Sequence, residues 1–216
     1  GEVSELFLEN KLMRGDLRII KTFERKVTPL AGVRFTVTGE TLAGEAYTGE
    51  FETDEQGQIY IEDLPVGTYT VQELGSELTK GYLLSEAQTV TVTFEKITEL
   101  QIENRLIRGS VKLIKTDKDS GAKLPGAVFA LYAPDGEELG EYITDENGEL
   151  LIEELPYDTG YKLIERKAPM GYQLAEVTFT FDITENGKVI ELAAVNEKIP
   201  PTDSPQTGDT FPMALW

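Results

Sequence analysis

In the stretch TDEQGQIYIEDLPVGTYTVQE (residues 53–73), short alternating runs of apolar and polar residues follow an acidic turn that contains glycine. Runs with a period of two, bounded by such turns, are typical of antiparallel strands. The stretch TDENGELLIEELPYDTGYKLIE (144–165) repeats the pattern. No dozen residues show the 3.6-residue apolar period of a helix. The sequence therefore predicts an all-β chain of antiparallel β-sandwiches with few, short helices.

An internal repeat sets the predicted number of domains. PLAGVRF (29–35) matches KLPGAVF (123–129), and the chain of 216 residues is long enough for two domains that each have a core. ELFLENKLMRG (5–15) resembles ELQIENRLIRG (99–109), so the chain is expected to begin with the last strand of a preceding, truncated unit, in which Asn10 lacks its partners. The predicted boundaries are 1–14 for that strand, 15–107 for the first repeat, 108–198 for the second repeat and 199–216 for a proline-rich spacer.

Composition excludes several classes of function. The chain has 39 acidic and 20 basic residues, a net charge of −19, no histidine and no cysteine. Such acidity disfavours nucleic acid and anionic membranes as partners. Without cysteine and histidine there are no disulfides, no thiolate zinc sites and none of the commonest general bases.

The acidic turns at 54–57 and 145–148 offer oxygen atoms that suit calcium. They lack the spaced carboxylates and the closing glutamate of an EF-hand loop, so hairpin turns are the preferred interpretation. The sequence predicts no metal site and no cofactor.

Three polar residues share a face with apolar neighbours on the predicted strands of each repeat. In LRIIK (17–21), the period of two places the lysine on the same face as Leu17 and Ile19, so the lysine faces the core. A glutamate and an asparagine point inward in the same way, and all three recur 92 to 94 positions later. Burying these groups separately would cost several kcal/mol each, so we expect them to meet. The residues are Lys21, Glu73 and Asn104 in the first repeat, and Lys115, Glu165 and Asn196 in the second.

Four segments of the second repeat resemble, in order, landmarks of the SpaA-like or Cna B-type domains of Gram-positive surface proteins and pili. The segments are IKTD (114–117), LPGAVFALY (124–132), YKLIERKAPMGY (161–172) and VNEK (195–198). The resemblance covers nearly the whole chain and implies two tandem Ig-like, prealbumin-like sandwich domains.

The first repeat departs from this family pattern at two places. Phe23 stands where the family often has aspartate, and the loop QELGSELTKGY (72–82) lacks Ala-Pro and is two residues longer. Both departures fall in predicted turns.

The resemblance implies an autocatalytic isopeptide bond in each repeat, formed when the lysine amine attacks the asparagine side-chain amide and releases ammonia. Burial lowers the pKa of an amine and raises the pKa of a carboxyl, which suits both groups to this reaction. Glu73 and Glu165 are the expected catalytic residues. Each would donate a hydrogen bond to the asparagine carbonyl and then carry a proton to the departing nitrogen. The alternative is a buried hydrogen-bonded cluster without a cross-link.

The C-terminal segment KIPPTDSPQTGDTFPMALW (198–216) begins as a polar spacer stiffened by proline. Within it, SPQTG resembles the LPxTG-type sorting signal, in which a sortase cleaves after threonine and joins it to peptidoglycan or to another pilin subunit. The matching residues are Ser204, Pro205, Gln206, Thr207 and Gly208, and Ser204 replaces the usual leucine. The alternative is a linker.

The resulting hypothesis is an extracellular stalk or pilus subunit, covalently anchored to a Gram-positive cell wall and supporting adhesion, with no catalytic turnover. The expected partners are a sortase and peptidoglycan or another pilin subunit. Two alternatives stay open. The repeats themselves bind a host surface protein or glycan, or they are accessory domains of a wall-bound enzyme.

Overall fold

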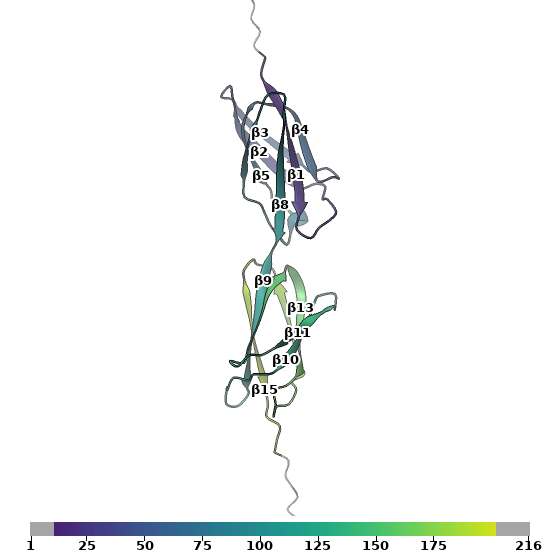
Figure 1. Ribbon diagram of the computed structural model, residues 1–216, viewed down its shortest axis with the longest axis vertical. Helices are drawn as coiled ribbons and strands as arrows, with labels where there is room; N and C mark the ends of the chain where they lie inside the picture. The colour runs from purple at the N-terminus through teal and green to yellow at the C-terminus, as the bar shows by residue number, and fades with distance from the viewer. Residues whose placement is uncertain (1–10, 202–216) are drawn as a thin grey trace, which may run out of the picture. The chain divides into compact units, whose positions relative to one another are not determined.

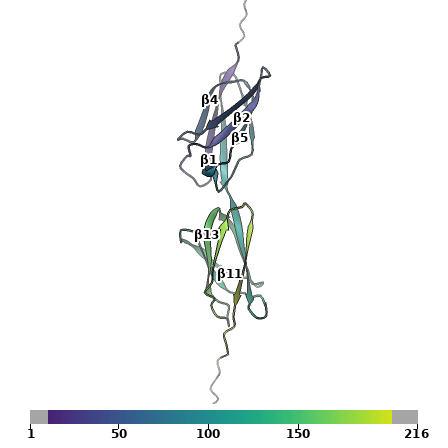
Figure 2. The same ribbon diagram turned by 180° about the vertical axis from the view of Figure 1, so that it is seen from behind.

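The computed structural model of the protein describes residues 11–201. Within this range the chain forms β-strands, which Figures 1 and 2 show, and one 3-10 helix, η1 (Glu77–Thr79). The all-β prediction is therefore confirmed. None of the described helices is long and apolar enough to cross a membrane. The predictions for residues 1–10, including Asn10, and for the sorting signal at 204–208 lie outside the described residues.

The first repeat is a sandwich of two four-stranded sheets, with orders β4-β1-β8-β6 and β3-β2-β5-β7. The longer loop at 72–82 contains η1, where the Thr79 hydroxyl accepts a hydrogen bond from the Ser76 N–H at 3.0 Å. The strands are β1 (Arg14–Phe23), β2 (Arg34–Thr41), β3 (Ala46–Glu52), β4 (Gln58–Pro65), β5 (Gly67–Glu73), β6 (Tyr82–Leu83), β7 (Gln88–Val92) and β8 (Ile97–Leu106).

The second repeat has the same strand order in sheets β12-β9-β15 and β11-β10-β13-β14. Among its described residues, the first of these sheets has no strand equivalent to β6. The strands are β9 (Arg108–Asp117), β10 (Val128–Tyr132), β11 (Glu138–Ile143), β12 (Glu149–Pro156), β13 (Asp158–Lys167), β14 (Thr178–Ile183) and β15 (Val189–Asn196).

One strand pair of the first repeat is parallel, although the sequence predicted antiparallel sandwiches. β1 and β8 run side by side in the same direction, from the pair Asp16 and Ile97 to the pair Phe23 and Asn104. Parallel neighbours need a long crossover connection, and here the six intervening strands supply it. The first and last strands of the repeat are thereby hydrogen-bonded neighbours.

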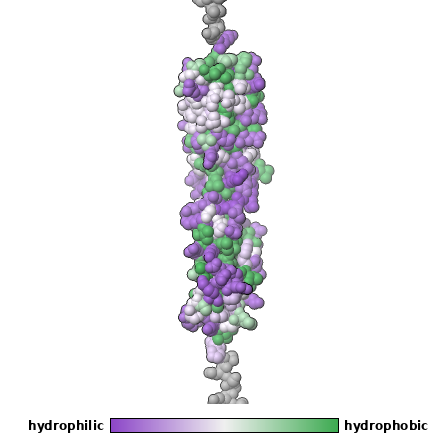
Figure 3. Space-filling view, turned by 60° about the vertical axis from the view of Figure 1, so that its left-hand side comes forward, coloured by the Kyte–Doolittle hydropathy of each residue, from purple (hydrophilic) through white to green (hydrophobic). Residues whose placement is uncertain are grey.

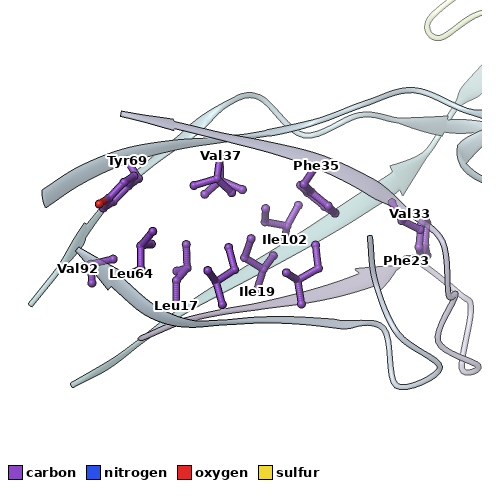
Figure 4. Close-up of a cluster of buried hydrophobic side chains, with 13 residues drawn as sticks. Leu17, Ile19, Phe23, Val33, Phe35, Val37, Leu64, Tyr69, Val92 and Ile102 are labelled. Atoms are coloured by element: carbon purple, nitrogen blue, oxygen red, sulfur yellow. The ribbon is translucent and has the colours of Figure 1, made fainter. Parts of the chain in front are cut away.

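The core lies between the inward faces of the two sheets. Figure 4 shows the side chains of the first repeat filling the space between the strand layers. Along β1, buried residues alternate with more exposed ones, as its sequence pattern predicts. Burying each large apolar side chain contributes roughly 1.5–3 kcal/mol. Lys21 lies on this buried face of β1, beyond Ile19. The outward faces mix polar and apolar residues, and Figure 3 shows hydrophilic residues interspersed with hydrophobic ones on the visible surface.

The two acidic turns are held by their aspartates. Asp54 Oδ1 accepts hydrogen bonds from the backbone N–H groups of Gln56 at 2.9 Å and Gln58 at 2.8 Å. Asp145 accepts two equivalent bonds in the second repeat. Side-chain to backbone bonds of this kind close hairpin turns. Among residues 11–201, no group of three or more aspartates or glutamates is placed to hold a metal ion.

The turn glycine of the second repeat can be tested by substitution. Gly148 has φ +67°, and an added Cβ would lie 2.6 Å from the Lys115 carbonyl oxygen and 2.7 Å from the Leu124 nitrogen. We expect Gly148→Ala to lower the free energy of unfolding by about 2 kcal/mol or more, since both the backbone conformation and the contacts are unfavourable. Urea unfolding measures the change.

The matched control is Gly121→Ala in the same repeat. Gly121 has φ +69° but nothing within 4 Å of an added Cβ. It should lose only the conformational part, about 1 kcal/mol. Equal losses for the two variants would contradict the close approach at Gly148.

Candidate functional site

In the first repeat the three predicted inward residues meet between the sheets. Lys21 on β1 and Asn104 on β8 belong to one sheet, and Glu73 at the end of β5 belongs to the facing sheet. Lys21 Nζ lies 3.7 Å from Glu73 Oε2, and Asn104 Nδ2 donates a hydrogen bond of 2.8 Å to Glu73 Oε1. Each residue is at most 3% exposed. The carboxyl thus contacts both the amine and the amide.

The parallel register of β1 and β8 brings the lysine and the asparagine together. Lys21 pairs with Ile102, and Phe23 pairs with Asn104. The lysine and the asparagine therefore occupy the same face of adjacent strands, displaced by two residues, which long side chains can span. Glu73 enters from the opposite layer, where its backbone pairs with Phe35 of β2.

The second repeat reproduces this arrangement. Lys115 Nζ lies 3.1 Å from Glu165 Oε1, and Asn196 Nδ2 donates a hydrogen bond of 2.9 Å to Glu165 Oε2. These three residues are at most 5% exposed. Glu165 on β13 pairs with Phe129 of β10, as Glu73 pairs with its phenylalanine in the first repeat.

Burial shifts the protonation equilibria at these sites. Burial lowers the pKa of Lys21 to about 8, against the opposing attraction of Glu73. Burial also raises the pKa of Glu73, although Lys21 and the hydrogen bond from Asn104 act in the other direction. The pKa of Lys115 is likewise lowered by burial. In the first repeat both shifts favour the neutral amine and the neutral carboxyl, so they favour a proton on the carboxyl and a neutral amine near the amide.

The asparagine amides have a defined orientation, with nitrogen toward the glutamate. In the first repeat the Ser85 backbone N–H donates to Asn104 Oδ1 at 3.2 Å. In the second, Asn196 Nδ2 also donates to the Gln173 carbonyl at 2.8 Å. A backbone N–H can only donate and a carbonyl can only accept, so these contacts fix the amides. The carboxyl therefore contacts the amide nitrogen, whereas the sequence analysis expected it to contact the carbonyl oxygen.

Sequence reasoning missed Ser85. Besides its N–H, its hydroxyl oxygen lies 3.3 Å from Asn104 Oδ1. Ser85 stands three residues after Tyr82 of the Gly-Tyr pair, and Ala175 has the same spacing from Tyr172 in the second repeat. A comparison of the two repeats at this position shows serine in one and alanine in the other, and this difference could have drawn attention to Ser85.

Phe23 in the first repeat and its equivalent in the second, Asp117, contact the equivalent tyrosine in different ways. In the second repeat the buried Asp117 accepts hydrogen bonds from the Ser120 N–H at 2.7 Å and from the Tyr172 hydroxyl at 2.9 Å. In the first repeat the Phe23 ring packs edge-on against Tyr82, with ring centroids 4.9 Å apart. The end of the first strand thus contacts the tyrosine of the Gly-Tyr pair in both repeats, through different chemistry.

Asp117 makes the stability of the second repeat depend on pH. Hydrogen bonds from Ser120, and then from Tyr172, hold the pKa of Asp117 well below its usual range. A lowered folded-state pKa stabilises the fold above the unfolded-state pKa of about 4, and this stabilisation is lost as the pH falls. We expect Asp117→Asn to lower the Tm of the second repeat at pH 7, with a smaller difference at pH 3. Thermal unfolding followed by calorimetry measures both, and a constant difference would contradict the assignment.

Comparison with known proteins gives the family. The model of the SpaA prealbumin-like fold domain matches residues 15–106 and 109–198. No curated protein matches the chain. Among solved structures, the Bacillus anthracis TIE protein is 31% identical, with a TM-score of 0.73 over 87% of this chain and 34% of that chain. This chain thus spans about a third of its length.

Two pilin structures are also similar. The Streptococcal ancillary pilin is 25% identical, covering 89% of this chain and 64% of that chain, with a TM-score of 0.38. The minor pilin GBS52 of Streptococcus agalactiae is 20% identical, covering 88% and 99%, with a TM-score of 0.40. The two segments matched by the family model make up most of the sequence, and the chain therefore belongs to the SpaA family of prealbumin-like fold domains, two of which it carries in tandem.

Proposed function

We propose that this chain is part of a surface protein stalk or pilus subunit anchored to a Gram-positive cell wall, in which each repeat is closed by a Lys-Asn isopeptide bond. The observation that carries the proposal is the buried carboxyl that contacts an amine and an amide in both repeats. The repeats are taken as 15–107 and 108–198. The bonded pairs are Lys21 with Asn104 and Lys115 with Asn196.

The chemistry starts with proton transfer from the lysine ammonium to the glutamate. The neutral Nζ then attacks the asparagine Cγ, forming an Nζ–Cγ bond and a tetrahedral intermediate. The glutamate gives its proton to Nδ2 and takes one from Nζ, so the Cγ–Nδ2 bond breaks and Nδ2 leaves as ammonia. The carboxyl ends protonated, as burial favours. The contact between Glu73 and Asn104 Nδ2 at 2.8 Å supports this transfer to the leaving nitrogen.

Each bond forms once, so the reaction is maturation without turnover. The first bond would close a loop of 84 residues from Lys21 to Asn104. A cross-link over a loop of this length stabilises the fold by on the order of 4 kcal/mol. Because it joins the first strand to the last, tension along the chain would pass through covalent bonds and bypass the hydrogen bonds between β1 and β8.

The family and the spacer sequence support the surface location. The chain carries two SpaA prealbumin-like fold domains, and its sequence resembles domains of Gram-positive surface proteins and pili. SPQTG (204–208) follows the second repeat in a proline-containing part of the sequence. A sortase would act on this segment and transfer the chain to peptidoglycan or to another pilin subunit. The protein is then extracellular, and its role in adhesion is to hold a binding region away from the wall.

The cross-links are tested by intact mass. We expect the purified chain to be lighter than its sequence by two ammonia molecules, one for each buried triple. Glu165→Gln should abolish the loss from the second repeat only, since glutamine fills the same space but cannot carry the proton. Peptide mapping assigns each bond. A mass equal to that of the sequence would contradict both bonds, and a retained second bond in the variant would remove Glu165 from its role.

Anchoring is tested with a sortase of the source organism. We expect cleavage between Thr207 and Gly208 and transfer of the Thr207 carboxyl to an added amine, because the sequence resembles a sortase signal and proline favours the extended backbone that a protease-like cleft binds. Sequencing of the joined peptide identifies the bond. Thr207→Ala is the control and should block transfer, whereas cleavage at another position would identify the segment as a linker.

A further inference from the structure

The oxygen side of the Asn104 amide faces two donors of Ser85, its N–H and its hydroxyl, and the N–H also interacts with the Glu73 carboxyl. The Ser85 N–H lies 3.2 Å from Asn104 Oδ1, and the Ser85 hydroxyl oxygen lies 3.3 Å from the same atom. Asn104 is fully buried. Glu73 is engaged on the nitrogen side of the amide. The carbonyl oxygen is therefore contacted by a residue that the proposed proton transfer does not use.

The short strand β6 positions Ser85. Tyr82 pairs with Leu106, and Leu83 pairs with Arg105, in antiparallel register. Ser85, two residues after Leu83, lies beside Asn104. Its hydroxyl oxygen is also 3.1 Å from the Glu103 carbonyl oxygen. β6 is hydrogen-bonded to β8, the strand that carries Asn104, so the donors are held on the same sheet as the reacting amide.

We infer that Ser85 is a further catalytic residue of the first repeat, where its N–H and hydroxyl form an oxyanion hole for Asn104 Oδ1. The inference rests on the proposed isopeptide bond. When Lys21 Nζ attacks Cγ, the electron pair of the carbonyl bond moves to Oδ1, which becomes negatively charged. Donors already aimed at that oxygen stabilise the charge as it develops. The Ser85 hydroxyl can donate its proton either to the Glu103 carbonyl oxygen or to Asn104 Oδ1. As Oδ1 becomes negatively charged it becomes the stronger acceptor, so the hydroxyl would donate to it.

The second repeat lacks this arrangement. Ala175 stands in place of the serine, and its N–H donates to Glu165 Oε2 at 3.1 Å. Asn196 Oδ1 is buried and accepts no hydrogen bond from the described residues. A groove of about 310 Å³, lined by Gln173, Ala175 and Asn196 among others, leaves space for a hydroxyl at position 175. The same chain thus contains a site with the oxyanion donors and a site without them.

The test follows both bonds in one full-length chain. The protein is made by cell-free synthesis with a short pulse of labelled amino acids, and samples are quenched in denaturant over time. Proteolysis and mass spectrometry then quantify the two branched peptides, one from each repeat. The rate of the second bond serves as the internal reference, because position 85 lies in the first repeat and its substitution does not change the second site.

Removing the hydroxyl should slow the first bond selectively. We expect Ser85→Ala to slow it by about tenfold relative to the second bond, less than for a complete oxyanion hole because the N–H remains. Ser85→Thr keeps a hydroxyl and should restore a rate close to that of the unsubstituted chain. Ala175→Ser should accelerate the second bond. An unchanged first-bond rate in Ser85→Ala would overturn the inference.

Two controls separate this inference from the function on which it rests. If the unsubstituted chain forms no bond in the first repeat, the proposed cross-link itself fails. If it forms the bond and Ser85→Ala forms it equally fast, only the role of Ser85 fails. In a Lys21→Ala background, whose first repeat cannot cross-link, Ser85→Ala should leave the Tm of the first repeat unchanged. A lowered Tm there, together with no acceleration by Ala175→Ser, would make Ser85 structural and overturn the inference.

Discussion

The contact between a buried carboxyl and a buried amine is the interaction on which both repeats depend. Either group alone would be costly to bury as an ion. Together they share one proton, and Lys21 and Glu73 show opposite pKa shifts because burial favours the neutral form of each. The desolvation that makes the two ions costly to bury also lowers the pKa of Lys21 and so favours its neutral amine. In the proposed reaction, stability and reactivity would have one cause, and the Asn104 amide lies against the same carboxyl.

The topology explains why this contact occurs at the end of the first strand. The parallel pairing of β1 and β8 places Lys21 and Asn104 on one sheet, while β5 brings Glu73 from the other. The residue two positions after the buried lysine differs between the repeats: Phe23 makes a ring contact with Tyr82, whereas Asp117 accepts a hydrogen bond from Tyr172. What the two repeats share is a contact between the end of the first strand and a tyrosine. That contact closes the same end of each sandwich, so the buried groups stay out of water.

Sequence patterns predicted the inward residues because a period of two fixes which face of a strand each side chain occupies. Lys21, Glu73 and Asn104 could be identified in this way, and so could the turns at Asp54 and Asp145. The parallel direction of β8 could not, since periodicity carries no information on strand direction. The amide orientation and the position of Ser85 were also inaccessible. Both depend on backbone groups in an irregular segment, where hydrogen bonds and not side-chain alternation decide the geometry.

The two repeats have the same contact at the nitrogen of the asparagine amide and different contacts at its oxygen, which separates two parts of the proposed reaction. Both have the carboxyl against the amide nitrogen, which in the proposed reaction would serve proton transfer to the leaving group. Only the first has donors from Ser85 at the carbonyl oxygen, among the residues that the structure describes. Folding holds amine, carboxyl and amide together in both repeats, so proximity would lower the barrier of the proposed reaction in both. The difference that remains is whether hydrogen-bond donors would stabilise the negative charge that develops on the asparagine Oδ1. In the proposed reaction each bond would form only once and would need no fast catalyst, so the serine at position 85 could be an alanine at the equivalent position 175 without loss of the cross-link, provided that the carboxyl stays in place.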